Sequence, residues 1–274
     1  MQQHREPAPP RLTRQNRGVV PSPVTVRLIG GPTLLIEVAG IRILTDPTFD
    51  PPGEYPSGPS VLVKTTAPAV TAEELGPVDV VLLSHDQHPD NLDAAGREYL
   101  ATVPLTVTTT AAAERLGGTA IGVEPWRHTE VALPSGDVLT IGAVPAQHGP
   151  DGMDASSGPV IGFVLSGDGI PTTYVSGDNA SVRVVEEVAD NAGPIEFAVL
   201  FGGGARAKRI DAYLTLRAHQ AVRAAELLDA RAIALVHAEG WQHFTQGPRE
   251  FADAFAAAGR SELVVLAPGE RRTL

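Results

Sequence analysis

The chain of 274 residues contains no cysteine. Disulfides, thiolate nucleophiles, iron–sulfur clusters and cysteine-based zinc fingers are therefore excluded, and any metal ion has to be held by His, Asp or Glu. Long hydrophobic runs are absent too: no stretch of about 20 apolar residues could span a bilayer. Residues 1–18 lack the apolar core of a signal peptide. We therefore expect a cytoplasmic protein.

Positive charge is in short supply. The sequence has 21 Lys and Arg against 32 Asp and Glu, a formal net charge of −11. Nucleic acids and anionic membranes bind clustered basic side chains, so we expect neither as a partner. An acidic protein can still hold a metal ion, because the ion brings its own positive charge. The expected partner is a small-molecule substrate, with a homo-oligomer left open.

Hydrophobic residues make up 43% of the chain, enough for a sizeable core. Residues 1–22 are rich in proline and charge and are predicted to form a flexible arm. Residues 23–274 show no internal linker and are predicted to form one domain. Each half opens with β-rich runs and closes with strand–helix alternation, which indicates two sheets with helices outside. Helices are predicted at 71–75, 93–101, 110–116, 181–190, 215–228 and 248–258, and an ordered loop at 47–69.

Residues 80–93, VVLLSHDQHPDNLD, combine a hydrophobic run with a cluster of polar side chains. The run predicts a buried strand. His85, Asp86, His88 and Asp90 follow within six positions, and Pro89 prevents regular hydrogen bonding there. We expect a shaped loop at a strand end. Imidazoles and carboxylates on such a loop are the ligands that a divalent transition metal needs, although His- and Asp-rich turns also occur on ordinary surfaces.

Three more residues of these types, His148, Asp178 and His237, follow apolar strand runs further along the chain. Taken singly, each would more often be an ordinary loop residue than a ligand. Functional sites gather at strand ends along one edge of a layered α/β fold. Four such placements, counting His85, are hard to explain as independent accidents. We therefore predict that these side chains converge on a metal ion.

Two further residues keep alternative interpretations. Asp46 ends a strand run and is interpreted as a turn-capping residue rather than as a metal ligand. His243 follows His237 in the segment HAEGWQH. It either contacts the substrate or leaving group as a donor, or forms hydrogen bonds in a surface turn.

The order of these motifs resembles that of the metallo-β-lactamase fold. The segment LIGGPTLLIEVAGIRILTDP is similar to the opening of the branch that includes ascorbate-6-phosphate lactonases and N-acyl-phosphatidylethanolamine phospholipases D. The resemblance covers residues 24–266. It implies a four-layer αββα sandwich of two mixed β-sheets flanked by helices. It also implies one or two divalent metal ions, with Zn²⁺ favoured and Mn²⁺ or Fe²⁺ as alternatives.

The resemblance also implies roles for individual residues. Asp90 would be catalytic, orienting the attacking water and taking its proton. The implied ligands are His88, His148 and either His85 or Asp86 for the first ion, and Asp90 and His237 for the second, with Asp178 between the two.

This chain departs from the family pattern His-x-His-x-Asp-His. Alignment on Asp90 puts Asp86 in the place of the first His, whereas alignment on His85 requires one extra residue before His88. In both alignments Asn91 stands in the place of the last His. Gly31 stands where the family often has a His in the first turn. Asn is a poor zinc ligand, so the second site is predicted to be oxygen-rich and weaker.

The predicted function is a cytoplasmic metal-dependent hydrolase, in which a metal-bound hydroxide attacks a small lactone, ester or phosphodiester. The alternative is a catalytically drifted protein of this fold that binds a ligand or partner without turnover. A di-iron redox site, as in some relatives, is a minor third option.

Overall fold

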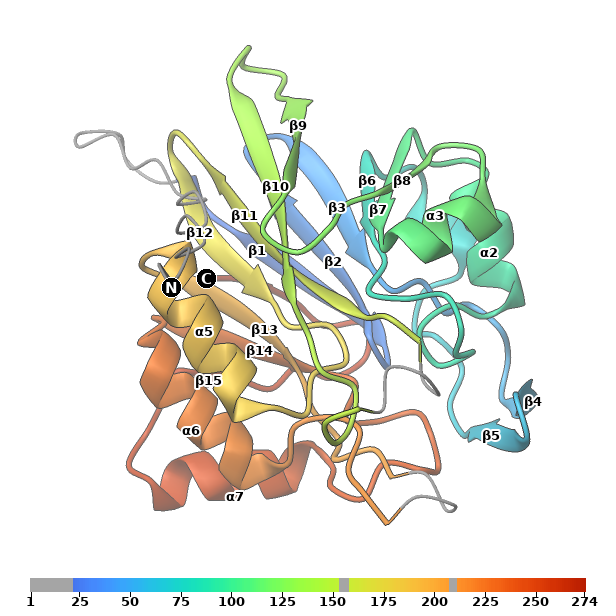
Figure 1. Cartoon of the computed structure of the whole chain (residues 1–274), viewed down its shortest axis with the longest axis vertical. Coiled ribbons are helices and arrows are strands. Elements are labelled where there is room, and N and C mark those ends of the chain that lie inside the picture. Colours follow the sequence, from blue (N-terminus) through green and yellow to red (C-terminus); the bar gives the residue numbers. More distant parts are fainter. Residues whose placement is uncertain (1–21, 153–157, 207–210) are drawn as a thin grey trace, which may run out of the picture.

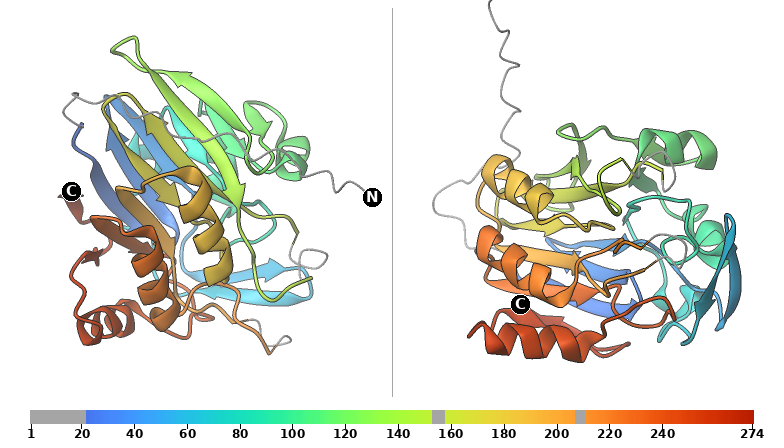
Figure 2. Two further views of the ribbon diagram at one scale, coloured as in Figure 1. Left: turned by 60° about the vertical axis from the view of Figure 1, so that its left-hand side comes forward. Right: turned by 60° about the horizontal axis from the view of Figure 1, so that its bottom comes forward.

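The computed structural model describes residues 22–152, 158–206 and 211–274. Two seven-stranded mixed sheets pack face to face, and helices cover both outer faces (Figures 1 and 2). This confirms the predicted α/β class and the four-layer sandwich. Residues 1–21, which make up nearly all of the predicted arm, lie outside the described residues.

The first sheet comes mainly from the first half of the chain. Strands β1, β2 and β3 form antiparallel hairpins, and β3, β6, β7 and β8 run parallel to one another. Gly30 and Gly31 both adopt positive φ angles in the first hairpin turn, a conformation that glycine tolerates best. The strands, in their order across the sheet, are β16 (Arg271–Thr273), β1 (Thr25–Gly30), β2 (Thr33–Val38), β3 (Ile41–Thr45), β6 (Val80–Leu82), β7 (Leu105–Thr108) and β8 (Ala120–Gly122).

The second sheet follows the same plan. Strands β9 to β12 are antiparallel neighbours, and β12 to β15 are parallel. The carboxyl ends of β10, β12, β13 and β14 therefore share one edge. In order across the sheet the strands are β15 (Leu263–Val264), β14 (Ala232–Val236), β13 (Phe197–Phe201), β12 (Ile170–Val175), β11 (Ile161–Gly167), β10 (Val138–Pro145) and β9 (His128–Ala132).

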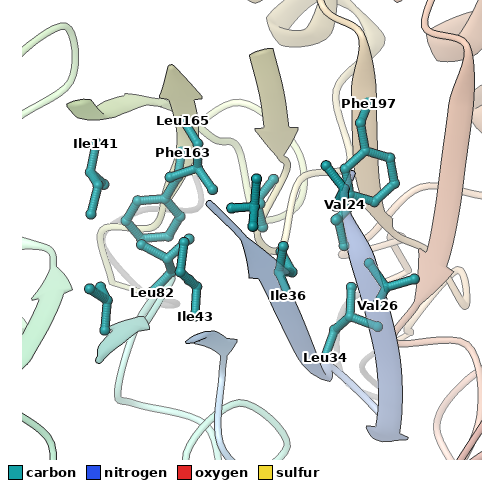
Figure 3. Close-up of a cluster of buried hydrophobic side chains, with 14 of the residues drawn as sticks. Val24, Val26, Leu34, Ile36, Ile43, Leu82, Ile141, Phe163, Leu165 and Phe197 are labelled. Carbon is teal, nitrogen blue, oxygen red and sulfur yellow. The ribbon is translucent and has the colours of Figure 1, made fainter. Parts of the chain in front are cut away.

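A hydrophobic core fills the space between the sheets (Figure 3). Val26, Leu34 and Ile36 reach it from the first sheet, and Phe163 and Phe197 from the second. Each is almost fully buried. Burying a side chain of this size contributes about 1.5–3 kcal/mol. The core therefore holds the sheets in a fixed relation, and with them the loops at their edges.

Helices close both outer faces. The second sheet is covered by α5 (Val182–Ala192), α6 (Ala218–Leu228) and α7 (Pro248–Ala257), whose apolar residues form a second buried cluster with it. The first sheet is covered by α1 (Ala72–Leu75) and α2 (Ala94–Leu100), with α3 (Thr110–Leu116) beside them. None of the helices in the described part of the chain is long and apolar enough to cross a membrane.

Several predicted helix starts are confirmed by their caps. The side chains of Thr71, Asp93 and Ser181 each accept a hydrogen bond from a backbone N–H in the first turn of α1, α2 and α5. Helix α6 begins at Ala218, later than the predicted 215. The hydroxyl of Thr215 is instead buried, donating to Gly202 O and accepting from Ala205 N.

The predicted loop at 47–69 is only partly a loop. It contains a two-stranded hairpin, β4 (Gly53–Ser57) and β5 (Ser60–Lys64). The many proline and glycine residues of this segment had indicated a loop and not two strands. Tyr55 packs edge-on against Trp241 at 5.9 Å between ring centroids, so the hairpin lies against the turn that follows β14.

Candidate metal centre

The side chains that the sequence singles out lie at strand ends of both sheets. His85 follows β6 in the first sheet, whereas His148, Asp178 and His237 follow β10, β12 and β14 in the second. Because these three strands point the same way, their carboxyl ends meet at one edge. The structure therefore brings together residues that are up to 152 positions apart in the sequence.

Three imidazoles form a first cluster, made of His85, His88 and His148. One ring nitrogen from each lies within 4.8 Å of the others. His85 Nε2 is 2.9 Å from His88 Nδ1, and the three ring centroids are 4.9–5.3 Å apart. Imidazole nitrogens at these separations can bind one ion of the size of Zn²⁺.

Buried partners orient two of these rings. His85 Nδ1 lies 2.9 Å from Ser84 Oγ, which donates its own proton to Asp46 Oδ2 at 2.6 Å. His148 Nδ1 lies 2.9 Å from the carbonyl oxygen of Leu214. Since a carbonyl only accepts, and Ser84 already donates to Asp46, both Nδ1 atoms carry the proton. This leaves each Nε2 with a free lone pair, as a metal ligand requires.

The electrostatic surroundings of His85 and His148 favour the neutral imidazole. Burial, with repulsion from His88 and His148, holds the pKa of His85 well below its usual range. Burial also lowers the pKa of His148, against the opposing charge of Asp178. A neutral imidazole can bind a cation without first losing a proton, so His85 and His148 are ready to bind at neutral pH.

Asp90, Asp178 and His237 form a second cluster, again with ligand atoms within 4.8 Å of one another. His237 Nε2 lies 3.3 Å from Asp90 Oδ2 and 3.6 Å from Asp178 Oδ1. The other oxygen of Asp178 lies 3.6 Å from His148 Nδ1. Asp178 therefore stands between the two clusters, where the sequence placed it.

Unpartnered buried atoms show that the residues present fit a cation. Among the described residues, neither oxygen of Asp178 has a hydrogen-bond donor, and Asp90 Oδ1 and His148 Nε2 have no partner. Asp178 and His237 are fully buried. A buried carboxylate without a hydrogen-bond donor costs free energy, and a bound cation would offset that cost.

The carboxylates of the second cluster also favour the binding of a cation. Burial alone would lower the pKa of His237, but the charges of Asp178 and Asp90 raise it to about 9. Burial would raise the pKa of Asp90, but hydrogen bonds from His237 and His243 hold it well below its usual range. Both carboxylates thus favour positive charge at this point, as a divalent ion would supply.

Two backbone features allow these loops to meet. Gly177, next to Asp178, has a φ of 56°, and a Cβ there would lie 2.5 Å from Ile161 O and 2.9 Å from Ser84 Cβ. Only glycine permits this close approach. His237 itself has a φ of 55°, which is uncommon for a residue with a side chain. Such strained positions gather at functional sites.

Asp86, the alternative first ligand, belongs to neither cluster. Its carboxylate forms ion pairs with Arg115, at short range, and with Arg97 at 3.8 Å. His85 therefore occupies the position that the sequence left open between these two residues. Asp86 instead faces Arg97 of α2 and Arg115 of α3.

Asn91, in the place of the family's last His, is buried and bonded to Asp46. Its Nδ2 donates to Asp46 Oδ2 at 3.0 Å. Asp46 accepts from Ser84 and Asn91 together, and burial raises its pKa to about 7. The structure agrees with the interpretation of Asp46 as a turn-stabilising residue and adds its support of His85.

Sequence reasoning missed two contacts of the centre. Ser84 directly precedes His85, and this position in the sequence is the signal that its hydroxyl could contact the imidazole. Leu214 acts only through its backbone carbonyl, for which the sequence holds no signal. His243 contacts the centre itself and is not confined to hydrogen bonds within a surface turn, since its Nε2 is 3.0 Å from Asp90 Oδ2.

Comparison with known proteins agrees with this architecture. The profile of the beta-lactamase superfamily domain matches residues 41–238, and the chain belongs to that family. A Pyrococcus abyssi protein described as a UPF0173 metal-dependent hydrolase is 28% identical over 255 residues, 92% of this chain and 100% of the relative. An N-acyl-phosphatidylethanolamine-hydrolyzing phospholipase D of Caenorhabditis elegans is 23% identical over 239 residues, 81% of this chain and 65% of the relative.

A solved structure shows the same fold. The isothiocyanate hydrolase from Delia radicum gut bacteria matches with a TM-score of 0.73 at 22% identity, over 90% of this chain and 98% of that one. The recognition of the metallo-β-lactamase fold from the sequence is thus confirmed.

Proposed function

We propose that the protein is a metal-dependent hydrolase that cleaves a small lactone, ester or phosphodiester. The observation that carries this proposal is the pair of buried clusters joined by Asp178, whose carboxylate oxygens have no hydrogen-bond donor among the described residues. Metal-dependent hydrolysis is also the described activity of the Pyrococcus abyssi relative.

The first ion would be held by His85, His88 and His148, and the second by Asp90 and His237, with Asp178 shared. Bound ions supply Lewis acidity and a water nucleophile at neutral pH. Zn²⁺ suits the three imidazoles of the first cluster, whereas the oxygens of the second also suit Mn²⁺ or Fe²⁺.

Asp90 has the geometry of a base that acts on the attacking water. Its Oδ2 lies 3.3 Å from His237 Nε2 and 3.0 Å from His243 Nε2 and would face the second ion, while its Oδ1 is free of partners in the described part of the chain. Oδ1 can accept the proton of the water as its oxygen bonds to the carbonyl carbon or phosphorus. The same proton can pass to the leaving oxygen when the ester bond breaks, so the step consumes one water and balances.

Metal analysis combined with a substrate screen tests this function. The purified chain, supplied with Zn²⁺ or Mn²⁺, should retain metal and hydrolyse at least one class among lactones, carboxylic esters and phosphodiesters. His88→Ala should lower the bound metal and the activity together, because it removes one of three imidazoles from the first cluster. The exposed His128→Ala serves as the matched control and should change neither.

A binding protein without turnover is the second candidate, favoured by the hydrogen bond that ties Asn91 to Asp46 rather than to the centre. Less than about a tenth of an equivalent of metal after loading would favour this candidate, because a centre with two clusters should retain at least one ion. Full metal content with activity on any of the three substrate classes would reject it.

A further inference from the structure

His243 lies beside the second cluster, with its Nε2 3.0 Å from Asp90 Oδ2. Asp90, Asp178 and His237 offer three ligands, one short of the four that a closed zinc site uses. The position of the family's last His holds Asn91, an amide that is a poor zinc ligand and whose Nδ2 donates to Asp46 Oδ2. A further imidazole reaches the cluster from a different part of the chain, the turn after β14.

We propose that His243 is a ligand of the second metal ion and replaces the missing last His of the loop. This inference rests on the metal centre of the proposed function and adds a ligand that lies outside the family pattern. His243 Nε2 approaches Asp90 Oδ2 to 3.0 Å, beside His237 Nε2 at 3.3 Å from the same oxygen.

These separations fit ligands of one ion. Atoms that bind a metal at about 2.0–2.2 Å, with bond angles near 90–110°, lie roughly 2.8–3.6 Å from one another. The contacts of Asp90 Oδ2 with His243 and His237, and that of His237 with Asp178 at 3.6 Å, fall in this range. His243 thus reaches the centre through Asp90, beside the three residues whose ligand atoms all lie within 4.8 Å of one another.

The turn that carries His243 is fixed from several sides. The backbone N–H of Gln242 donates to Val63 O in β5 at 2.9 Å, and His243 O accepts from Arg206 N at 3.1 Å. The ring of His243 lies against Phe244, with 4.6 Å between centroids. A ligand held in this way loses little freedom when an ion binds, which favours affinity.

His243 is also the most accessible member of the set. Its side chain is 15% exposed, whereas those of His237 and Asp178 are fully buried. The second ion would therefore be approached from the side of His243. This places the hairpin and Trp241 beside the ligand that faces the solvent.

Metal titration of matched variants tests the role of His243. The wild-type chain should bind about two equivalents of Zn²⁺ or Co²⁺. His243→Ala should keep the first equivalent and weaken the second by more than the roughly 10–100-fold that loss of an outer hydrogen-bond partner costs. In the Co²⁺ form, the visible d–d bands of the second equivalent should also change. His128→Ala, an exposed imidazole on β9, is the control and should match the wild type.

A rescue variant separates ligation from a structural role. His243→Ala combined with Asn91→His returns an imidazole to the position that the family pattern prescribes and should restore the second equivalent. Circular dichroism of each variant reports folding, and His243→Ala alone decides the matter if the double variant does not fold.

Each remaining outcome has a clear meaning. Unchanged affinity and unchanged Co²⁺ bands in His243→Ala would overturn the inference, as would a wild-type chain that takes up a single ion. In both cases the metal-dependent function would stand. A wild-type chain that binds no metal would overturn the proposed function as well.

Discussion

The two clusters of the metal centre contain different types of ligand, and their side chains are held in place in different ways. In the first, three imidazoles converge, and two of them are oriented by partners inside the fold, Ser84 and Leu214 O. In the second, carboxylates predominate, and both oxygens of Asp178 lack a donor among the described residues. A ligand set whose orientation is fixed before binding loses less freedom when it binds. We therefore expect the first position to be filled first and the geometry of the second to depend on the ion itself.

The largest effect is expected where the two clusters join. Asp178→Ala removes the carboxylate shared by both, so both ions should be weakened, each by more than about 100-fold, and activity should be lost. Metal content after dialysis against a weak chelator measures this. Asp190→Ala, on the exposed side of α5, should match the wild type. Loss of one ion only would show that Asp178 does not bridge the clusters.

A second change addresses the support of the first cluster alone. Ser84→Ala breaks the chain that links Asp46 to His85, and loss of such a partner typically lowers metal affinity about 10–100-fold. The first equivalent should weaken by this amount and the second should not, as read from a Zn²⁺ titration. Ser135→Ala, in an exposed turn, is the control. Equal weakening of both ions would mean that the clusters do not differ in their support.

The strand ends, the helix caps and the convergence of four distant residues could be predicted from the sequence because these features depend on local patterns. A buried run followed by His85, or Thr71 three residues before Glu74, carries its meaning within a few positions. The choice between His85 and Asp86 could not be predicted, since Arg97 and Arg115 decide it from other elements. The partner of Asn91 lies 45 residues away, and only the folded chain brings Asp46 to it.

A third change uses pH to examine Asp46 beneath the first cluster. Folding raises the pKa of Asp46 from 3.8 to about 7 because the carboxyl is buried. Between these values the folded chain holds a proton that the unfolded chain has released, so Asp46 lowers the stability of the folded chain as pH rises. Its contribution is fully present below about pH 4 and is lost as pH rises toward about 7.

Urea denaturation of the metal-free chain at several pH values measures this effect. Asp46→Asn cannot ionise, so the variant should lack this part of the downward slope, whatever its absolute stability. Metal-free protein is required because bound cations would favour the ionised carboxylate. An identical slope in both proteins would show that Asp46 is ionised throughout this range.

The smallest effect is expected just outside the centre, at Asp86. Its ion pairs join a buried carboxylate to arginines whose side chains are nearly half exposed, and such pairs contribute about 1 kcal/mol or less. Asp86→Ala should therefore lower the free energy of unfolding by about that amount and leave the metal content unchanged. His85→Ala, one position earlier, should lose the first ion. If Asp86→Ala remained folded and lost the ion while His85→Ala kept it, Asp86 rather than His85 would be the ligand of the first ion. The first cluster would then contain a carboxylate, and the contrast between the two clusters would be smaller.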